Sequence, residues 1–81
     1  MRLQYSRTAL AALEAAPVSI RKAFYKQAAF LLHDLHHPSL RAKKYSERED
    51  RWQGRVNRNW RFYFRILDDT YLIDAIVPHP K

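Results

Sequence analysis

The chain contains no cysteine, a single glycine and no long apolar run. Without cysteine it can form neither a disulfide frame nor a thiolate metal site. No segment approaches the ~18 consecutive apolar residues that a membrane-spanning helix needs. Residues 1–6 lack the apolar run of a signal peptide. We therefore expect a protein that stays in the cytoplasm, away from membranes.

Acidic residues are also in the minority. Eight Asp and Glu stand against fifteen Lys and Arg, which gives a formal net charge of +7. Such a bias favours a nucleic acid, an anionic membrane surface or an acidic protein as the partner, although it can also serve solubility alone. Because the basic residues cluster on the faces predicted below, we favour a binding role.

Length and composition predict one small domain that spans residues 1–81. Hydrophobic residues make up 47% of the chain, which is enough for a globular core without covalent staples. A domain of this size buries only about 60% of its unfolded surface, so we expect the core to be modest.

The most informative segment is residues 52–66, in which apolar and polar residues alternate. The even positions carry Trp52, Gly54, Val56, Trp60, Phe62, Phe64 and Ile66, and the odd positions carry Gln53, Arg55, Asn57, Arg61, Tyr63 and Arg65. Alternation with a period of two is typical of strands that bury one face. The segment therefore predicts a β-hairpin with one apolar and one basic face, in which the glycine accommodates Phe62 opposite it.

The turn of this hairpin decides which side chains face one another. A turn at residues 57–59 places Val56 opposite Trp60 and Arg55 opposite Arg61. Like charges directly opposite each other destabilise a sheet. A small domain tolerates such a pair most easily when an anion sits between the two guanidinium groups. The arrangement points to phosphate, and so to nucleic acid.

A third strand is predicted at residues 70–77, after a turn at Asp68-Asp69. The expected pairs are Ile66 with Tyr71, Phe64 with Ile73, Phe62 with Ala75, and Trp60 with Val77. This register places the apolar residues of all three strands on one side of the sheet. A slip by one residue would turn every side chain over, so the agreement supports the register.

The first half of the chain predicts a short strand at residues 2–6 and a helix at residues 7–15, capped by Ser6. A second helix is predicted from about 17 to 35, with Pro17 in its first turn and its end near His36, because Pro38 disfavours helix before it. Its apolar stripe consists of Ile20, Phe24, Ala28, Leu31, Leu32 and Leu35. Residues 38–51 form a charged connection that Leu40 anchors to the core.

The order of the elements is strand, helix, helix and three strands. It predicts an α+β fold in which two N-terminal helices pack on one face of a curved antiparallel sheet, in the order β-α-α-β-β-β. The other face of the sheet is left to Asn57, Arg55, Arg61, Tyr63 and Arg65.

This layout resembles the RelE/ParE superfamily, which comprises toxins of bacterial type II toxin–antitoxin modules. The resemblance is carried by residues 55–65, Arg-Val-Asn-Arg-Asn-Trp-Arg-Phe-Tyr-Phe-Arg, by the approach at residues 37–44 and by the ending at residues 77–81. It covers nearly the whole chain. The basic, aromatic-bearing face is similar to that of the RelE- and HigB-like branch.

The resemblance implies an endoribonuclease that needs neither metal nor cofactor, cleaves messenger RNA, in many members within the ribosomal A site, and so inhibits translation. The 2′-hydroxyl of the RNA attacks the adjacent phosphate, and the protein stabilises the phosphorane that forms. The implied partners are the messenger RNA, the ribosome and a cognate antitoxin with which the toxin assembles. No membrane is implied.

The same chemistry implies roles for individual residues. Arg55 and Arg61 are expected to stabilise the phosphorane, and His79 to act as the acid/base group, because histidine titrates near neutral pH. The residues expected to contact the RNA are Arg41, Lys43, Lys44, Tyr45, Asn57, Arg58, Tyr63 and Lys81, with Tyr45, Tyr63 or Trp52 stacking a base.

Other interpretations stay open. A ParE-like toxin would act on DNA gyrase, and a non-catalytic module would bind RNA or another partner without cleaving it. Arg61 or Arg65 could pair with Asp74 on the surface of the sheet. The histidines at 33, 36 and 37 have spacings that a metal could use, but no carboxylate or cysteine pattern completes a site, so we expect no metal.

Overall fold

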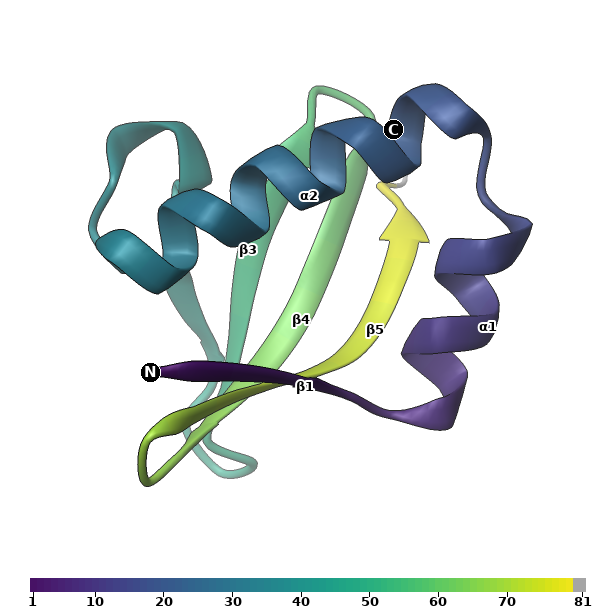
Figure 1. Ribbon diagram of the computed structural model, residues 1–81. Helices are drawn as coiled ribbons and strands as arrows, with labels where there is room; N and C mark the ends of the chain where they lie inside the picture. Colours follow the sequence, from purple (N-terminus) through teal and green to yellow (C-terminus); the bar gives the residue numbers. More distant parts are fainter. Residues whose placement is uncertain (80–81) are drawn as a thin grey trace.

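The alternating residues of the C-terminal half form the centre of a five-stranded sheet, across which a long helix runs (Figure 1). The computed structural model describes residues 1–79. Its elements are β1 (Arg2–Tyr5), α1 (Arg7–Ala15), α2 (Val18–His33), the 3-10 turn η1 (Pro38–Leu40), β2 (Lys43–Ser46), β3 (Arg51–Asn57), β4 (Trp60–Leu67) and β5 (Thr70–Pro78). The strand order is β1-β5-β4-β3-β2. The predicted α+β class is confirmed.

Both helices begin where the sequence predicts. Ser6 caps α1, since its Oγ accepts a hydrogen bond of 3.0 Å from the backbone N–H of Ala9, and α2 follows Pro17 directly. The predicted end of α2 near His36 is wrong, because the helix stops at His33. Asp34 adopts an extended backbone there, and its carboxylate accepts the backbone N–H of His36 at 2.9 Å, which turns the chain away.

The sheet is mixed rather than wholly antiparallel. β1 pairs in parallel with β5, from Arg2 opposite Thr70 to Tyr5 opposite Ile73. Parallel pairing requires a long connection between the two strands, and the two helices and the rest of the sheet supply it. The expectation of an antiparallel sheet is therefore wrong for this one edge.

A strand was also missed on the other edge. β2 lies within the charged connection and pairs with β3, with Lys43 opposite Gln53 and Lys44 opposite Trp52. Its residues Lys-Lys-Tyr-Ser show little apolar alternation, because an edge strand faces solvent and charged residues protect it from further pairing.

The β3–β4 hairpin brings Arg55 opposite Arg61 and the glycine opposite Phe62, as predicted. The predicted pair of Val56 with Trp60 is wrong, since Trp60 lies opposite Asn57 and the register shifts between residues 55 and 57. This β-bulge keeps Val56 in the core and strengthens the local twist of the hairpin.

A second bulge lies between β4 and β5. Ile66 faces Tyr71 and Phe64 faces Ile73, as predicted, but beyond them the register shifts by one residue. The predicted pairs of Phe62 with Ala75 and of Trp60 with Val77 are therefore wrong, and their actual partners are Ile76 and Pro78. The bulge leaves Asp74 without a partner across the ladder, and it turns Ile76 rather than Ala75 into the core.

One core lies between the helices and the sheet. Its largest fully buried side chains are Phe24, Phe62, Phe64, Leu31, Leu40, Ile73 and Ile76. The ring of Phe24 on α2 meets Phe62 edge to face, with 5.5 Å between the centroids. Leu40 anchors the connection as predicted, whereas Leu32, expected on the apolar stripe, is exposed.

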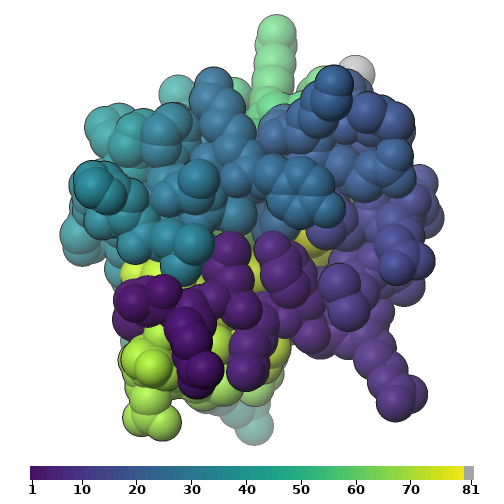
Figure 2. All heavy atoms as spheres, viewed as in Figure 1, coloured from purple at the N-terminus to yellow at the C-terminus, as the bar shows by residue number. Residues whose placement is uncertain are grey.

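The helices lie on one side of the sheet, which we call the helix side. In Figure 2, α2 in blue lies over the sheet, the purple N-terminal segment with the edge strand β1 lies beside it, and a green projection of the β3–β4 hairpin extends beyond the helix. The opposite face of the sheet, which we call the open face, carries the side chains of Arg51, Gln53, Arg55, Arg61, Tyr63 and Arg65.

Candidate nucleic-acid interface

A hollow of about 230 Å³ lies on the open face near the turn of the β3–β4 hairpin. Its lining residues are Arg41, Lys43, Gln53, Arg55, Arg61 and His79. All of them except Gln53 were predicted as site residues from the sequence. The fold therefore brings together residues that are far apart along the chain, from the connection after α2, from both strands of the hairpin and from the end of β5.

Arg55 and Arg61 form the centre of the hollow as cross-strand neighbours. Arg61 is held in place by its own turn, since its Nη1 donates hydrogen bonds to the backbone oxygens of Asn57 at 2.7 Å and Trp60 at 2.9 Å. Burial lowers the pKa of Arg61, and the positive charges of Arg55 and Arg41 lower it further. An anion placed among these three groups would relieve their repulsion.

Arg41 reaches the hollow through an unusual backbone conformation. It follows η1 with φ 46 and ψ 41, in the left-handed region that residues other than glycine seldom adopt. This conformation turns the chain from η1 into β2, where Lys43 lies opposite Gln53. The turn thus places Arg41 and Lys43 beside the hairpin.

His79 lies next to the hairpin turn. Its backbone N–H donates a hydrogen bond of 2.7 Å to the oxygen of Asn59, which ties the chain after β5 to the β3–β4 turn. Its side chain is exposed and lines the hollow with Arg55 and Arg61. The predicted proximity of these three residues is therefore observed, while their roles stay predictions.

The remaining predicted residues lie outside this hollow. Lys44 bonds to Asp50, which raises its pKa, and its Nζ lies 5.3 Å from the ring centroid of Trp52. Tyr45 and Tyr63 touch edge to face with centroids 4.9 Å apart. Those not yet placed are Asn57 and Arg58, which line a second hollow on the helix side, and Lys81, which is outside the described residues.

Gln27 is a structural residue of the site that the sequence did not reveal. Although it is buried on α2, its Nε2 donates to the backbone oxygens of Arg55 at 2.7 Å and Ser39 at 3.0 Å. Its Oε1 accepts from Ser39 Oγ at 3.2 Å. A polar residue between Phe24 and Leu31, at helical spacing on the apolar stripe, is the signal that could have indicated this role.

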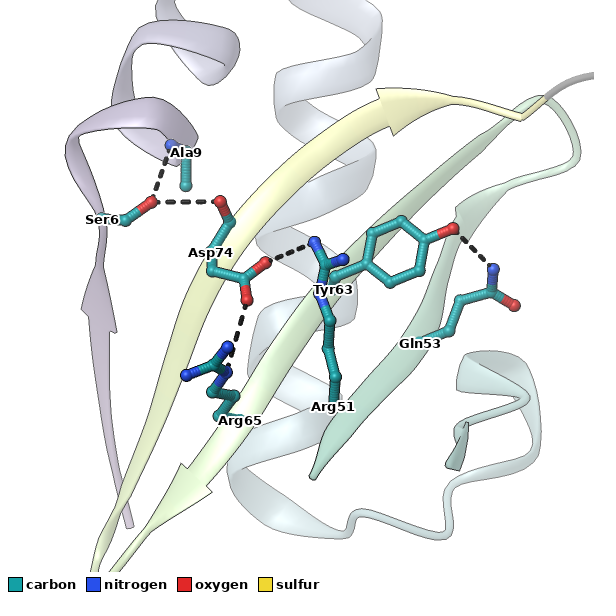
Figure 3. Close-up of polar contacts among 7 residues, drawn as sticks. All are labelled: Ser6, Ala9, Arg51, Gln53, Tyr63, Arg65 and Asp74. Carbon is teal, nitrogen blue, oxygen red and sulfur yellow. Dashed lines mark hydrogen bonds and ion pairs between the residues drawn. The ribbon is translucent and has the colours of Figure 1, made fainter. Parts of the chain in front are cut away.

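The open face also carries the carboxylate of Asp74. Arg51 donates to it at 2.9 Å and Arg65 approaches it at 3.9 Å (Figure 3). The predicted pairing of Arg65 is confirmed, and the alternative pairing of Arg61 is not observed. The backbone oxygen of Asp74 also accepts a hydrogen bond from Ser6 Oγ at 3.1 Å.

The charge inside the hollow is not neutralised by the part of the chain that the structure describes. Within residues 1–79 none of the lining residues is acidic, and none of them takes part in an ion pair. Several guanidinium groups without carboxylate partners can bind a phosphate with paired hydrogen bonds and can stabilise added negative charge on it. A titratable imidazole beside them can transfer a proton.

Residues 1–79 contain neither a helix that could span a membrane nor a cluster of metal ligands. No helix is both long and apolar enough to cross a membrane. The side chains of His, Cys, Asp and Glu form no group of three or more that could hold a metal ion. The histidines near the end of α2 therefore do not come together as ligands, and His37 instead stacks on Phe30 with 3.9 Å between the ring centroids.

No family model matches the sequence, and no curated protein matches it. Solved structures, however, share its fold.

The chain is similar to a YoeB/ParE toxin from Agrobacterium tumefaciens, with a TM-score of 0.83, 10% identity and coverage of 99% of this chain and 100% of that one. It is similar to the archaeal RelE–RelB complex from Pyrococcus horikoshii, with a TM-score of 0.78, 16% identity and coverage of 95% and 92%. It is also similar to YafQ from Escherichia coli, with a TM-score of 0.71, 13% identity and coverage of 95% of this chain and 91% of that one. The chain therefore has the fold of the RelE-like toxins.

Proposed function

We propose that the chain is the toxin of a type II toxin–antitoxin system and acts as an endoribonuclease on messenger RNA. The observation that carries this proposal is the convergence of Arg41, Arg55 and Arg61 with His79 around one hollow, where none of the lining residues among 1–79 is acidic. The fold, shared with toxins named RelE, YoeB and YafQ, supports it.

The reaction needs a nucleophile that the RNA itself supplies. The 2′-oxygen forms a bond to phosphorus and loses its proton, while the bond from phosphorus to the 5′-oxygen breaks and that oxygen gains a proton. The negative charge that builds up on the phosphoryl oxygens is met by Arg55 and Arg61. Preorganised cations aimed at developing charge supply a large share of such catalysis.

His79 either takes the proton from the 2′-oxygen or supplies the proton to the 5′-oxygen, and water exchanges the other proton. An imidazole can both accept and donate a proton, unlike the guanidinium, ammonium and amide groups that line the hollow with it. Arg61 is unsuited to that task because an arginine side chain stays protonated. Its hydrogen bonds to the turn instead fix the position of its charge.

The partner that restrains this activity is a cognate antitoxin. Several similar structures are complexes of a toxin with its antitoxin, including RelBE from Escherichia coli and YoeB–YefM from Staphylococcus aureus. We infer that an antitoxin covers the basic open face of this chain and that the free toxin acts in the cytoplasm, on messenger RNA bound to the ribosome.

Cleavage of messenger RNA tests the proposal, with ribosome-bound RNA in magnesium buffer and with free RNA in EDTA, because ribosomes dissociate when EDTA removes magnesium. Arg55→Ala is expected to lower kcat/KM by roughly 10²–10³, the usual effect of removing one group that stabilises the transition state. Arg65→Ala is the matched control, because Arg65 lies on the same face but approaches Asp74. Far-UV circular dichroism checks the fold of both variants. Equal rates for Arg55→Ala and Arg65→Ala would contradict the site.

A second candidate is supported by the likeness to a structure named a YoeB/ParE toxin. In that case the chain inhibits DNA gyrase, and RNA stays intact. A supercoiling assay with purified gyrase separates the two. Inhibited supercoiling with uncut RNA favours the second candidate, and neither effect favours a binding module without chemistry.

A further inference from the structure

A larger groove of about 560 Å³ lies on the helix side of β3, between α2, η1 and the hairpin turn. We call it the helix-side groove. Its cationic lining residues are Lys26, Arg41, Arg55 and Arg58. Its volume is within the range of roughly 300–1,000 Å³ that is usual for ligand-binding clefts.

The helix-side groove is continuous with the hollow on the open face. Arg41 and Arg55 line both of them. The two meet around the end of β3, which β2 leaves uncovered because their pairing reaches no further than Lys43 opposite Gln53. Gln27 supports this uncovered end through its hydrogen bond to the oxygen of Arg55.

The side chain of Gln27 and the side-chain oxygen of Asn57, two polar groups of the groove, already take part in hydrogen bonds. Gln27 uses both its amide group and its oxygen in hydrogen bonds with Arg55 and Ser39. Asn57 accepts the backbone N–H of Asn59 at 2.9 Å with its side-chain oxygen. The floor of the groove therefore has few groups left to read the edges of bases, and its main attraction for a ligand is positive charge.

The cations of the groove are open to solvent. Lys26 and Arg58 are exposed, and within residues 1–79 neither takes part in an ion pair. None of the described lining residues is acidic. A ligand with regularly spaced negative charges fits this groove, and a polynucleotide backbone has that property.

We propose that the helix-side groove binds the phosphates that flank the cleaved one, so that a single RNA strand curves around the end of β3. Lys26 and Arg58 each contact one flanking phosphate, and Arg41 bridges the two sites. This inference rests on the proposed function, since the open-face hollow must hold the reacting phosphate. The contacts are independent of base sequence, because they use charge alone.

The test uses single-stranded 2′-O-methyl RNA, which lacks the nucleophilic hydroxyl and stays uncut. Binding of a trimer and of a 12-mer is followed by fluorescence anisotropy at several salt concentrations. The double variant Lys26→Ala/Arg58→Ala is compared with Lys22→Ala/Arg48→Ala, which removes the same charge from exposed positions outside the groove. Lys26→Gln/Arg58→Gln provides a second groove variant, and thermal melting checks that all of them fold.

The groove variants are expected to bind the 12-mer about tenfold more weakly than the control pair. The slope of log K against log salt should fall in magnitude by about 1.4, because each lost phosphate contact removes ~0.7 for a single strand. Binding of the trimer should match that of the control pair, because a trimer occupies the open-face hollow alone.

Equal 12-mer affinities for the groove and control variants would overturn the inference. So would unchanged RNA binding together with weakened antitoxin binding, which would make the groove a protein site. If the wild-type protein fails to cut RNA but the difference between the variants persists, the nuclease proposal fails and the groove stands.

Discussion

Arg51 on β3 reaches across β4 to Asp74 on β5, with 2.9 Å between Nη2 and Oδ1. On the way its guanidinium carbon lies 4.4 Å from the ring centroid of Tyr63 (Figure 3). Arg65 approaches the other carboxylate oxygen at 3.9 Å. The open face is thus divided, because the carboxylate of Asp74 pairs with arginines at one end, while within residues 1–79 the cations of the hollow at the other end have no carboxylate partner.

Asp74→Asn removes the carboxylate from this network. Both side chains of the Arg51 pair are mostly covered, with 26% and 21% exposed. We therefore expect a loss of about 1–2 kcal/mol in the free energy of unfolding, between the values for exposed and buried pairs. Urea denaturation measures it, with Asp68→Asn as the control at an exposed turn position that has φ 54 and tolerates asparagine. Equal urea midpoints for Asp74→Asn and Asp68→Asn would show that the Arg51–Asp74–Arg65 network contributes nothing to the free energy of unfolding.

Gly54→Ala tests the close approach of the two hairpin strands. A Cβ at position 54 would lie 2.6 Å from Cε1 of Phe62, and this ring cannot move freely because it packs against Phe24 and Phe64, each with 5.5 Å between centroids. We expect a loss of about 1–3 kcal/mol, which is typical of overpacking. Chemical denaturation measures it.

A double-mutant cycle separates this overlap from other effects of alanine. In a Phe62→Leu background the ring is gone, so Gly54→Ala should cost less than in the wild-type chain. An equal cost in both backgrounds would place the effect in the backbone of β3 and not in the contact with Phe62.

Gln27→Leu tests the support beneath Arg55. It would leave the backbone oxygens of Arg55 and Ser39 without their side-chain donor in a partly buried place, where the loss is expected to lie at the lower end of the about 1–3 kcal/mol for an unsatisfied group. Gln4→Leu, at an exposed position of β1, is the control. Hydrogen exchange should also show faster opening of the end of β3 in Gln27→Leu. Protection that equals that of Gln4→Leu would contradict this role.

Alkaline pH should weaken the fold through two tyrosines. Burial raises the pKa of Tyr5 and of Tyr71 above the ordinary 10.0, with smaller contributions from Tyr25 and Asp34 respectively. The folded state therefore keeps protons that the unfolded chain has released, so stability is intact below about pH 10 and falls as the pH rises beyond it.

The urea midpoint, compared between about pH 9 and about pH 11, measures this loss. The decrease in midpoint should be smaller for the double variant Tyr5→Phe/Tyr71→Phe than for the exposed control Tyr45→Phe. A loss of the same size in both would assign the alkaline effect to other groups, such as the lysines.

The central hairpin could be predicted from the sequence because apolar and polar residues alternate along residues 52–66, which indicates one buried and one exposed face. The pairing of Arg55 with Arg61 followed from that alternation. The bulge at Asp74 could not be predicted, because Ala75 and Ile76 are both apolar and either can face the core. Tertiary packing determines which of the two faces the core. The larger Ile76 fills it, with 1% of its surface exposed.

The hollow could be predicted only in part. Arg55, Arg61 and His79 lie on elements whose order and register the apolar pattern indicates. Arg41 depends on a left-handed turn, φ 46, that its residue type does not favour. Gln27 depends on tertiary hydrogen bonds to η1 and β3, and such long-range contacts leave no periodic signal in the chain.

The proposed site binds phosphate where arginines of residues 1–79 lack carboxylate partners. The most direct measurement follows the side-chain Nε–Hε NMR signals of the arginines during titration with uncleavable single-stranded RNA. Signals of Arg41, Arg55 and Arg61 should shift together and saturate, while those of Arg51 and Arg65 stay in place. Shifts confined to the arginines around Asp74, or spread evenly over all of them, would contradict the account.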